Sequence, residues 1–419
     1  MELKNIYFHY FLLLLIGFPV FVDGQLKPDE INFTRQAVRR FVFEDDYSVP
    51  LAKMNPREII GMGSMYPTTH HLEAHAQLNL EKGLLSIGSD SLSNTTIWLS
   101  GFNPFATYVL DVDSCGGQGT MGFKFSDQQD EEQISVATHY EQGRVQDVSL
   151  SCVKNGKIVF HESILLDNVS NIPIDGRLIL QMLGSGLNVY IDSEKLPVPI
   201  AQADFSDIID LRAKKYLHNF QSELLFQIDH GSVSIHGASV ALSAGMGLAD
   251  IRAITYEDGS PLLDQDRLWY TMTIRGRGLP HNLQGVFSLN PTVFDLRFEG
   301  VIVFDKNDGI LRNEVASHIF YDRKEKLWRG LTTGFSAYAN KEEHKQLLAI
   351  ESTKDPRFGF SVMKASPFGM IGDIEDPHIL YDKRDEKWRI LACENIDGYK
   401  AVLLESENWN NGYHRISGP

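Results

Sequence analysis

The sequence is poor in cysteine and has no cluster of basic residues. Its 419 residues contain only Cys115, Cys152 and Cys393, an odd number that excludes a complete set of internal disulfides. No Cys/His spacing of a zinc site occurs. The net charge is −16 at pH 7. Because phosphate binding needs clustered Lys and Arg, this charge argues against a nucleic-acid partner.

Several catalytic signatures are also missing. The sequence has no G-x-S-x-G elbow, no Walker loop and no dinucleotide fingerprint. It does have the material for a packed core, since 43% of its residues are hydrophobic and 22% are charged. The length predicts two or three domains.

A long apolar run occurs at the N-terminus. Lys4 precedes the run from Ile6 to Val22, and polar residues follow from Asp23 onward. This pattern predicts a signal peptide over residues 1–24, and therefore a secreted or periplasmic protein with no membrane span after cleavage. An uncleaved anchor is the alternative, which the short run and the absence of a positive flank disfavour.

Residues 25–71 are expected to form an extended lead-in segment, and residues 72–245 a β-sandwich. Short apolar or alternating runs, separated by turn residues, are typical of strands in such a sandwich. Asn155-Gly156 lies between two of these runs and predicts a hairpin.

The sandwich region resembles concanavalin-like (laminin-G-like) jelly rolls over roughly 170 residues. The resemblance rests on Asn155-Gly156-Lys157 and on Val189-Tyr190-Ile191-Asp192. No cofactor is expected, except that one group of carboxylates offers the oxygen ligands of a calcium site, with solvated surface as the alternative. This group is Asp111, Asp113, Glu131 and Glu132.

Residues 246–419 contain a repeat. The segments 318–329 and 378–389 match at a spacing of 60, and Trp269, Trp328 and Trp388 lie 59 and 60 residues apart. A period of this size predicts blades of a β-propeller, each beginning with a strand, a charged turn and a second strand. About three units fit before Pro419, so we expect a propeller that is truncated in this chain.

Each unit begins with acidic residues next to its first strand. Innermost strands line the axis of a propeller, so carboxylates at these starts would face one funnel. Glycoside hydrolysis needs a pair of carboxyl groups, one protonated acid and one base or nucleophile. Crowding of carboxylates raises the pKa of one of them, as a general acid requires.

At these residues the sequence resembles the five-bladed propellers of glycoside hydrolase family 43. The resemblance implies that Asp250 is the general base and that Glu375, in Glu375-Asp376-Pro377-His378, is the general acid of an inverting enzyme. Family members have an Asp in blade two that tunes the acid, but here Ala316 matches that position and Glu314 is the nearest carboxylate.

Other residues at the unit starts are expected to bind substrate: Arg252, His318, Asp376 and His378. Equal positions of the two histidines in the repeat also favour a packing role for them. Asp376-Pro377 and Cys393-Glu394 give a second resemblance, to family 32 fructosidases, although Glu375 replaces their Arg and the Cys-Glu order is reversed.

The sequence thus predicts an all-β chain, a jelly-roll sandwich followed by a five-bladed propeller, truncated here. It predicts a secreted glycoside hydrolase that acts on plant or algal oligosaccharides or polysaccharides. A non-catalytic carbohydrate-binding protein is the first alternative, which Ala316 favours. A polysaccharide lyase that uses His318, His378 and Arg252 is the second.

Overall fold

The computed structural model describes residues 42–63, 71–167, 169, 171–192, 196–335 and 343–418. The expected signal peptide lies outside these residues, as does most of the lead-in segment. Residues 41–419 form one compact unit by their contacts, so the expected boundary after residue 245 stays a prediction. Among the described residues, no helix is long and apolar enough to cross a membrane.

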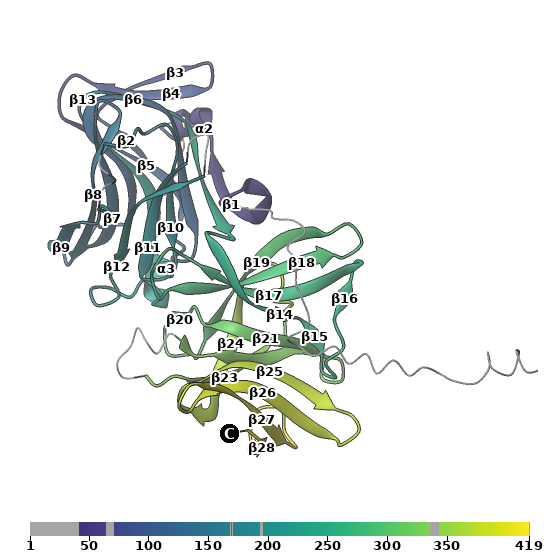
Figure 1. The fold of residues 1–419 in the computed structure, drawn as a ribbon. Coiled ribbons are helices and arrows are strands. Elements are labelled where there is room, and N and C mark those ends of the chain that lie inside the picture. Colours follow the sequence, from purple (N-terminus) through teal and green to yellow (C-terminus); the bar gives the residue numbers. More distant parts are fainter. Residues whose placement is uncertain are drawn as a thin grey trace, which may run out of the picture. The chain divides into compact units, whose positions relative to one another are not determined.

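The first part of the chain forms one sheet of 13 strands that folds over itself (Figure 1). Its strands are β1 (Ser48–Met54), β2 (Leu72–Ala74), β3 (Gln77–Glu81), β4 (Leu84–Ser89), β5 (Ser93–Gly101), β6 (Thr107–Ser126), β7 (Glu132–Glu141), β8 (Arg144–Lys154), β9 (Lys157–Ser163), β10 (Gly176–Met182), β11 (Gly186–Asp192), β12 (Val198–Asp204) and β13 (Gln221–Ser243). Three short helices accompany them: η2 (Asp45–Tyr47), α2 (Pro56–Met62) and α3 (Lys214–Asn219).

The two longest strands, β6 and β13, run through both layers of this sandwich. The first half of β6 pairs with β10 and the second half with β7, while the two ends of β13 pair with β5 and β1. Buried side chains of both layers, such as Leu110 and Phe226, form one core between them. The all-β class and jelly-roll-like sheets expected from the sequence are confirmed.

Glycines allow β6 and β13 to approach closely where they change layer. Gly117 and Gly231 are paired and have φ values of +78° and +105°. A Cβ on Gly231 would lie 2.2 Å from the carbonyl oxygen of Gly116. Only glycine fits there, because a side chain would be strained by the backbone angle and would also overlap the facing strand.

The end of the expected lead-in belongs to the sandwich. Strand β1 pairs antiparallel with β13, from Ser48 opposite Ser243 to Met54 opposite Ala238. Helix α2 follows directly, and Asn55 caps it with a complete capping box to Glu58. Within the expected lead-in segment, residues 48–54 therefore form a strand and residues 56–62 a helix.

The second part of the chain contains three consecutive four-stranded antiparallel units. Unit one has β14 (Gly247–Ala253), β17 (Arg267–Arg275), β18 (Asn282–Asn290) and β19 (Asp295–Asp305). Unit two has β21 (Val315–Asp322), β22 (Leu327–Thr333), β23 (Gln346–Ser352) and β24 (Gly359–Ile371). Unit three has β25 (Ile374–Asp382), β26 (Lys387–Asn395), β27 (Tyr399–Ser406) and β28 (His414–Ser417).

Short strands supplement these units: β15 (Thr255–Tyr256), β16 (Leu263–Asp264) and β20 (Leu311–Arg312). Units one and two share one sheet, because β19 pairs parallel with β24 and β15 pairs parallel with β21. Unit three is a separate four-stranded sheet. A five-bladed propeller is not shown by the described residues.

The repeat found in the sequence has equal register in units two and three. Tyr321 lies opposite Trp328, and Tyr381 lies opposite Trp388, with ring centroids 5.1 Å and 5.3 Å apart. These aromatic cross-strand pairs stabilise each hairpin. Trp328 and Trp388 are thus packing residues.

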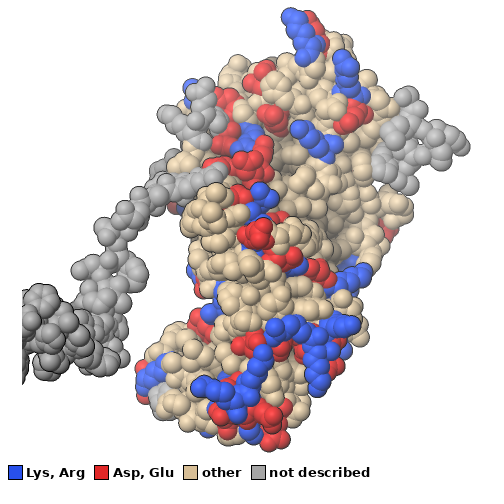
Figure 2. Space-filling model, turned by 90° about the vertical axis from the view of Figure 1, so that its right-hand side faces the viewer, with Lys and Arg blue, Asp and Glu red and all other residues tan. Residues whose placement is uncertain are grey.

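Ion pairs connect the turns of the three units. Arg323 of unit two lies 2.6 Å from Glu257 and 2.8 Å from Asp258 in unit one, and Lys383 of unit three lies 2.5 Å from Asp258. Figure 2 shows acidic and basic side chains next to one another over the lower part of one face. Burial raises the pKa of Asp258, but the hydrogen bonds from Lys383, Ser260 and Arg323 together outweigh it and hold this pKa below its usual range.

Candidate active site

The first strand of each unit carries a β-bulge at the same position. The register of the pairing shifts between Ala249 and Arg252, between Val315 and His318, and between Glu375 and His378. The second residue of each bulge has a left-handed backbone: φ is +52° at Asp250, +56° at Ala316 and +60° at Asp376. The structure therefore makes Asp250, Ala316 and Asp376 equivalent.

Hydrogen bonds between units hold these bulges. The backbone N–H of Ala316 donates to Thr273 Oγ1 of unit one at 3.4 Å, and that of Asp376 donates to Thr333 Oγ1 of unit two at 3.1 Å. Thr273 lies opposite Ala249 and Thr333 opposite Val315, so the two threonines also occupy equal positions. Each unit thus fixes the bulge of the next one.

Three carboxylates from two units line one cavity of about 490 Å³. They are Asp250, Glu375 and Asp376, so the structure brings together the proposed base and acid. The other lining residues are Arg275, Gly276, Gly278, Leu279, Pro280, Asn282, Val315 and Phe335. A cavity of this size accommodates a small sugar.

Each carboxylate of the cavity has a cation beside it. Lys345 Nζ lies 2.6 Å from Glu375 Oε2, and Arg252 Nη2 lies 3.1 Å from Asp376 Oδ1. Arg275 Nη2 is 3.7 Å from Asp250 Oδ2, too far for a hydrogen bond. The closest of these three contacts is the one between Lys345 and Glu375.

Lys345 is the contact that sequence reasoning missed. Its side chain is only 7% exposed and also lies 2.5 Å from Asp373 Oδ1. Lys345 and an Asn395 hydrogen bond lower the pKa of Asp373. Lys345 lies before β23, outside the repeated segments, so the sequence contains no signal that it reaches Glu375.

Glu314 does not line the cavity. Its side chain is 1% exposed and its Oε1 lies 4.0 Å from Nε of the buried Arg312. The bulge of unit two presents Val315 to the cavity instead. Glu314 is therefore not part of this cavity, and its expected catalytic role stays a prediction.

Another set of equivalent residues lies two positions after the left-handed residue of each bulge. These residues are Arg252, His318 and His378. The rings of His318 and His378 are in contact, with centroids 3.9 Å apart and planes tilted by 33°. His318 is fully buried, and its Nδ1 accepts a hydrogen bond from the Ile379 N–H at 3.1 Å. Its Nε2 therefore carries the proton and donates to Thr255 Oγ1 at 3.3 Å.

Burial lowers the pKa of both histidines, and the charge of Arg252 lowers each further. Both rings are therefore neutral at pH 7. Neither histidine lines the carboxylate cavity. His318 has no exposed surface for a substrate, so the expected binding role is replaced by packing at this position.

The second family resemblance gains no support from the site. Cys393 lies opposite Glu375 in the β25–β26 pairing, and burial raises the pKa of its thiol, with a smaller contribution from Asp376 and Glu375. Glu394 is ion-paired with Arg415 and does not line the cavity. Among the described residues the three cysteines are free thiols.

The carboxylates expected as a calcium site are not brought together. Asp111 lies near the start of β6, opposite Arg177 of β10, whereas Gln133, the neighbour of Glu132, lies opposite Ser126 at the end of β6. Within the described part of the chain, no group of three or more His, Cys, Asp or Glu side chains is arranged to hold a metal ion.

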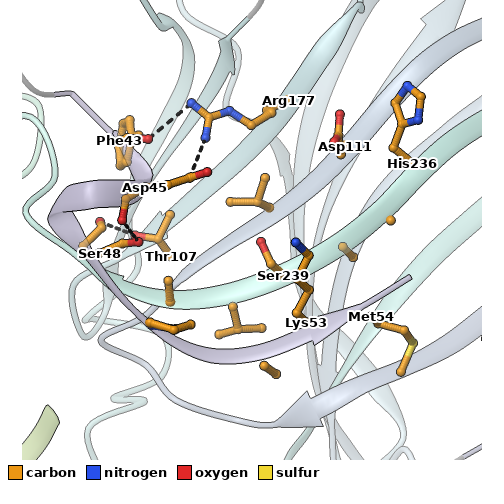
Figure 3. Close-up of a pocket in the computed structure, with 18 of the residues that line it drawn as sticks. Phe43, Asp45, Ser48, Lys53, Met54, Thr107, Asp111, Arg177, His236 and Ser239 are labelled. Carbon is orange, nitrogen blue, oxygen red and sulfur yellow. Dashed lines mark hydrogen bonds and ion pairs between the residues drawn. The ribbon is translucent and has the colours of Figure 1, made fainter. Parts of the chain in front are cut away.

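A second cavity of about 460 Å³ lies on the sandwich (Figure 3). Its floor is formed by β6, β13 and β1, where small or short side chains such as Val109 and Ala241 face outward. Charged residues surround this floor: Asp45, Lys53, Asp111, Arg177 and His236. This cavity was not predictable from the sequence, because the strands that form it are far apart along the chain.

Comparison with known proteins finds likeness in structure alone. No family model and no curated protein matches the chain. A β-agarase A from Zobellia galactanivorans is 9% identical over 47% of this chain and 90% of its own, with a TM-score of 0.31.

A carbohydrate-binding module, CBM66 from Bacillus subtilis, is 15% identical over 41% of this chain and 95% of its own, with a TM-score of 0.26. A legume lectin-like domain from Entamoeba histolytica is 13% identical over 48% and 98%, with a TM-score of 0.30. At such TM-scores the likeness carries no argument. None of these three structures is a family 43 propeller, so the propeller resemblance stays a prediction.

Proposed function

We propose that the protein acts on carbohydrate and cleaves a glycosidic bond in the cavity formed by Asp250, Glu375 and Asp376. The convergence of three carboxylates from two repeat units on one cavity carries this proposal. Glycoside hydrolysis is the chemistry that such a set supports, with one group as acid and another as base or nucleophile. We further propose that the three units are blades of a propeller, and that the protein is exported.

The ion pairs suggest which carboxylate takes which role. Lys345 Nζ lies 2.6 Å from Glu375 Oε2, within hydrogen-bond reach, whereas Arg275 Nη2 lies 3.7 Å from Asp250 Oδ2, beyond that reach. We therefore assign the base or nucleophile role to Glu375, the reverse of the assignment that the family resemblance implies. Asp250, whose nearest cation is 3.7 Å away, becomes the acid.

Two variants distinguish these assignments on a panel of aryl glycosides. If Asp250 is the acid, Asp250→Ala keeps activity on dinitrophenyl glycosides, whose leaving group needs no proton, and loses it on unactivated substrates. If Glu375 is the base or nucleophile, azide restores turnover in Glu375→Ala by attacking the anomeric carbon, which yields a glycosyl azide. The opposite pattern would restore the original roles.

A matched control is Glu162→Gln, an exposed carboxylate on β9 of the sandwich. This variant should hydrolyse every substrate at the wild-type rate. If the wild-type protein releases no aryl group and no reducing ends from plant or algal polysaccharides, the hydrolase proposal fails.

Ala316 favours a second candidate, a non-catalytic carbohydrate-binding protein. It occupies the position equivalent to Asp250 and Asp376, so one of three equal places has no carboxylate. Sugar binding by the intact chain without any release of reducing ends would support this candidate.

A further inference from the structure

The sandwich cavity contains two charged side chains that have no partner within the protein. Among the described residues, neither Asp111 nor Lys53 forms a hydrogen bond or an ion pair, although both line the cavity. Most other charged side chains around it are paired: Arg177 with Asp192 and Asp45, and His236 with Asp113 at 3.4 Å. Asp111 and Lys53 are therefore available to a ligand.

The strand register puts these two side chains on the same face of the sheet. Asp111 of β6 lies opposite Gly237, and Lys53 of β1 lies opposite Ser239, two residues further along β13. Figure 3 shows Asp111, Ser239 and Lys53 on the same side of the strands. Two strand spacings and two residue steps separate them, which amounts to roughly 12 Å between Cα atoms.

The pairing also explains why His236 faces the cavity. Ile235 lies opposite Val112 and Gly237 opposite Asp111, so His236 is the extra residue of a bulge in β13. Gly237 has a φ of +146°, and a Cβ there would lie 2.5 Å from the carbonyl oxygen of Met54. The absence of a side chain at Gly237 leaves room between Asp111 and β1.

These groups define the chemistry of a ligand. A carboxylate without a partner accepts hydrogen bonds from hydroxyl groups, and an ammonium without a partner attracts an anionic group. The small, largely apolar floor between them accommodates flat rings. The separation of the two charges suits a ligand of two rings, neutral at one end and anionic at the other.

We propose that this cavity binds an acidic disaccharide unit, with hydroxyls of a neutral sugar at Asp111 and the carboxylate of a uronic acid at Lys53. The inference rests on the proposed action on carbohydrate and adds a binding site and a sugar class to it. Through this site the sandwich would hold an acidic polysaccharide independently of the carboxylate cavity.

The test measures equilibrium binding of two probes by calorimetry: glucuronosyl-xylose, and glucosyl-xylose as its neutral counterpart. The full chain with Asp250→Asn and Glu375→Gln is used, so that neither probe is consumed. We expect the acidic probe to bind up to about fivefold more tightly, the effect of one ion pair with the exposed Lys53.

Three variants on that background locate the site. Lys53→Met should remove the preference for the acidic probe and leave binding of the neutral probe unchanged, whereas Asp111→Asn should weaken both. Lys157→Met, which removes an exposed lysine on β9, should change neither. Equal affinity for the two probes, or an unchanged preference in Lys53→Met, would overturn the proposal.

Hydrolysis assays on the chain with intact Asp250 and Glu375 separate this inference from the proposed function. Wild-type rates of aryl glycoside hydrolysis in Lys53→Met and Asp111→Asn would show that the carboxylate cavity works without the sandwich site. Failure of the probes to bind would then count against the sandwich site alone. If the acidic preference is found but no glycoside is cleaved, only the proposed hydrolase activity fails.

Discussion

Replacing Lys345 by Met tests whether this lysine holds Glu375 in place. Methionine keeps an unbranched apolar stem and removes the ammonium that lies 2.6 Å from Glu375 and 2.5 Å from Asp373. Loss of one partner from a fully buried ion pair costs about 3–5 kcal/mol. The Glu375 and Asp373 side chains are 18% and 39% exposed, so water offsets part of the loss. We expect the free energy of unfolding to fall by about 2 kcal/mol at pH 7.

The penalty should depend on pH in a defined direction. Lys345 lowers the pKa of Asp373 in the folded protein. A carboxyl group with a lowered folded pKa stabilises the fold above its unfolded pKa of about 3.9, and this contribution is lost as the pH falls through the folded value. The difference between wild type and Lys345→Met should therefore be full at pH 7 and shrink below about pH 4.

Urea unfolding at pH 7, 5 and 3.5 measures this difference. A double-mutant cycle with Glu375→Gln isolates the Lys345–Glu375 contact, and Lys364→Met, which changes an exposed lysine on β24, is the control. A coupling energy of zero, or a penalty that is the same at every pH, would refute the reasoning.

Two further predictions concern stability. Burial lowers the pKa of the half-buried His378, so the free energy of unfolding should fall as the pH drops below about 6.5. His378→Phe should reduce this slope in urea unfolding between pH 7.5 and 5.5, and the exposed His161→Gln should not. Gly231→Ala should destabilise the sandwich by more than about 2 kcal/mol, because a Cβ would meet backbone 2.2 Å away in addition to the strain of its φ of +105°. Gly83→Ala, with a φ of +83° but open space around it, should cost only the strain, about 1 kcal/mol, and equal urea midpoints for the two variants would contradict the close-approach argument.

Features carried by short stretches of sequence were predictable. The Asn155-Gly156 turn joins β8 and β9 with φ values of +50° and +68°, as its residue pair predicts. The match between 318–329 and 378–389 reappears as two hairpins with the same register. In both cases the residues that determine the structure are neighbours along the chain.

Features that depend on distant pairing were not predictable. Strand β1 joins the sheet by pairing with residues 238–243, almost 200 positions away, and no local pattern marks that partner. Lys345 reaches Glu375 from a segment outside the repeat. Glu314 was expected at the cavity because it lies near the start of a strand, but its buried side chain lies near Arg312, and Val315 lines the cavity instead.

The bulges also show which carboxylate carries the functional argument. Asp tolerates a left-handed backbone better than most residues, so Asp250 and Asp376 have a conformational reason to occupy their positions. Ala316 adopts the same angle without a carboxylate, which shows that the fold does not need one there.

Glu375 has no such conformational reason to occupy its position. Its equivalents, Ala249 and Val315, are apolar, and its own backbone is ordinary strand. Neither the backbone nor the packing calls for a charged residue at that place, yet a nearly buried lysine is directed at it. The case for chemistry in this cavity therefore rests on Glu375 and Lys345 more than on the two aspartates.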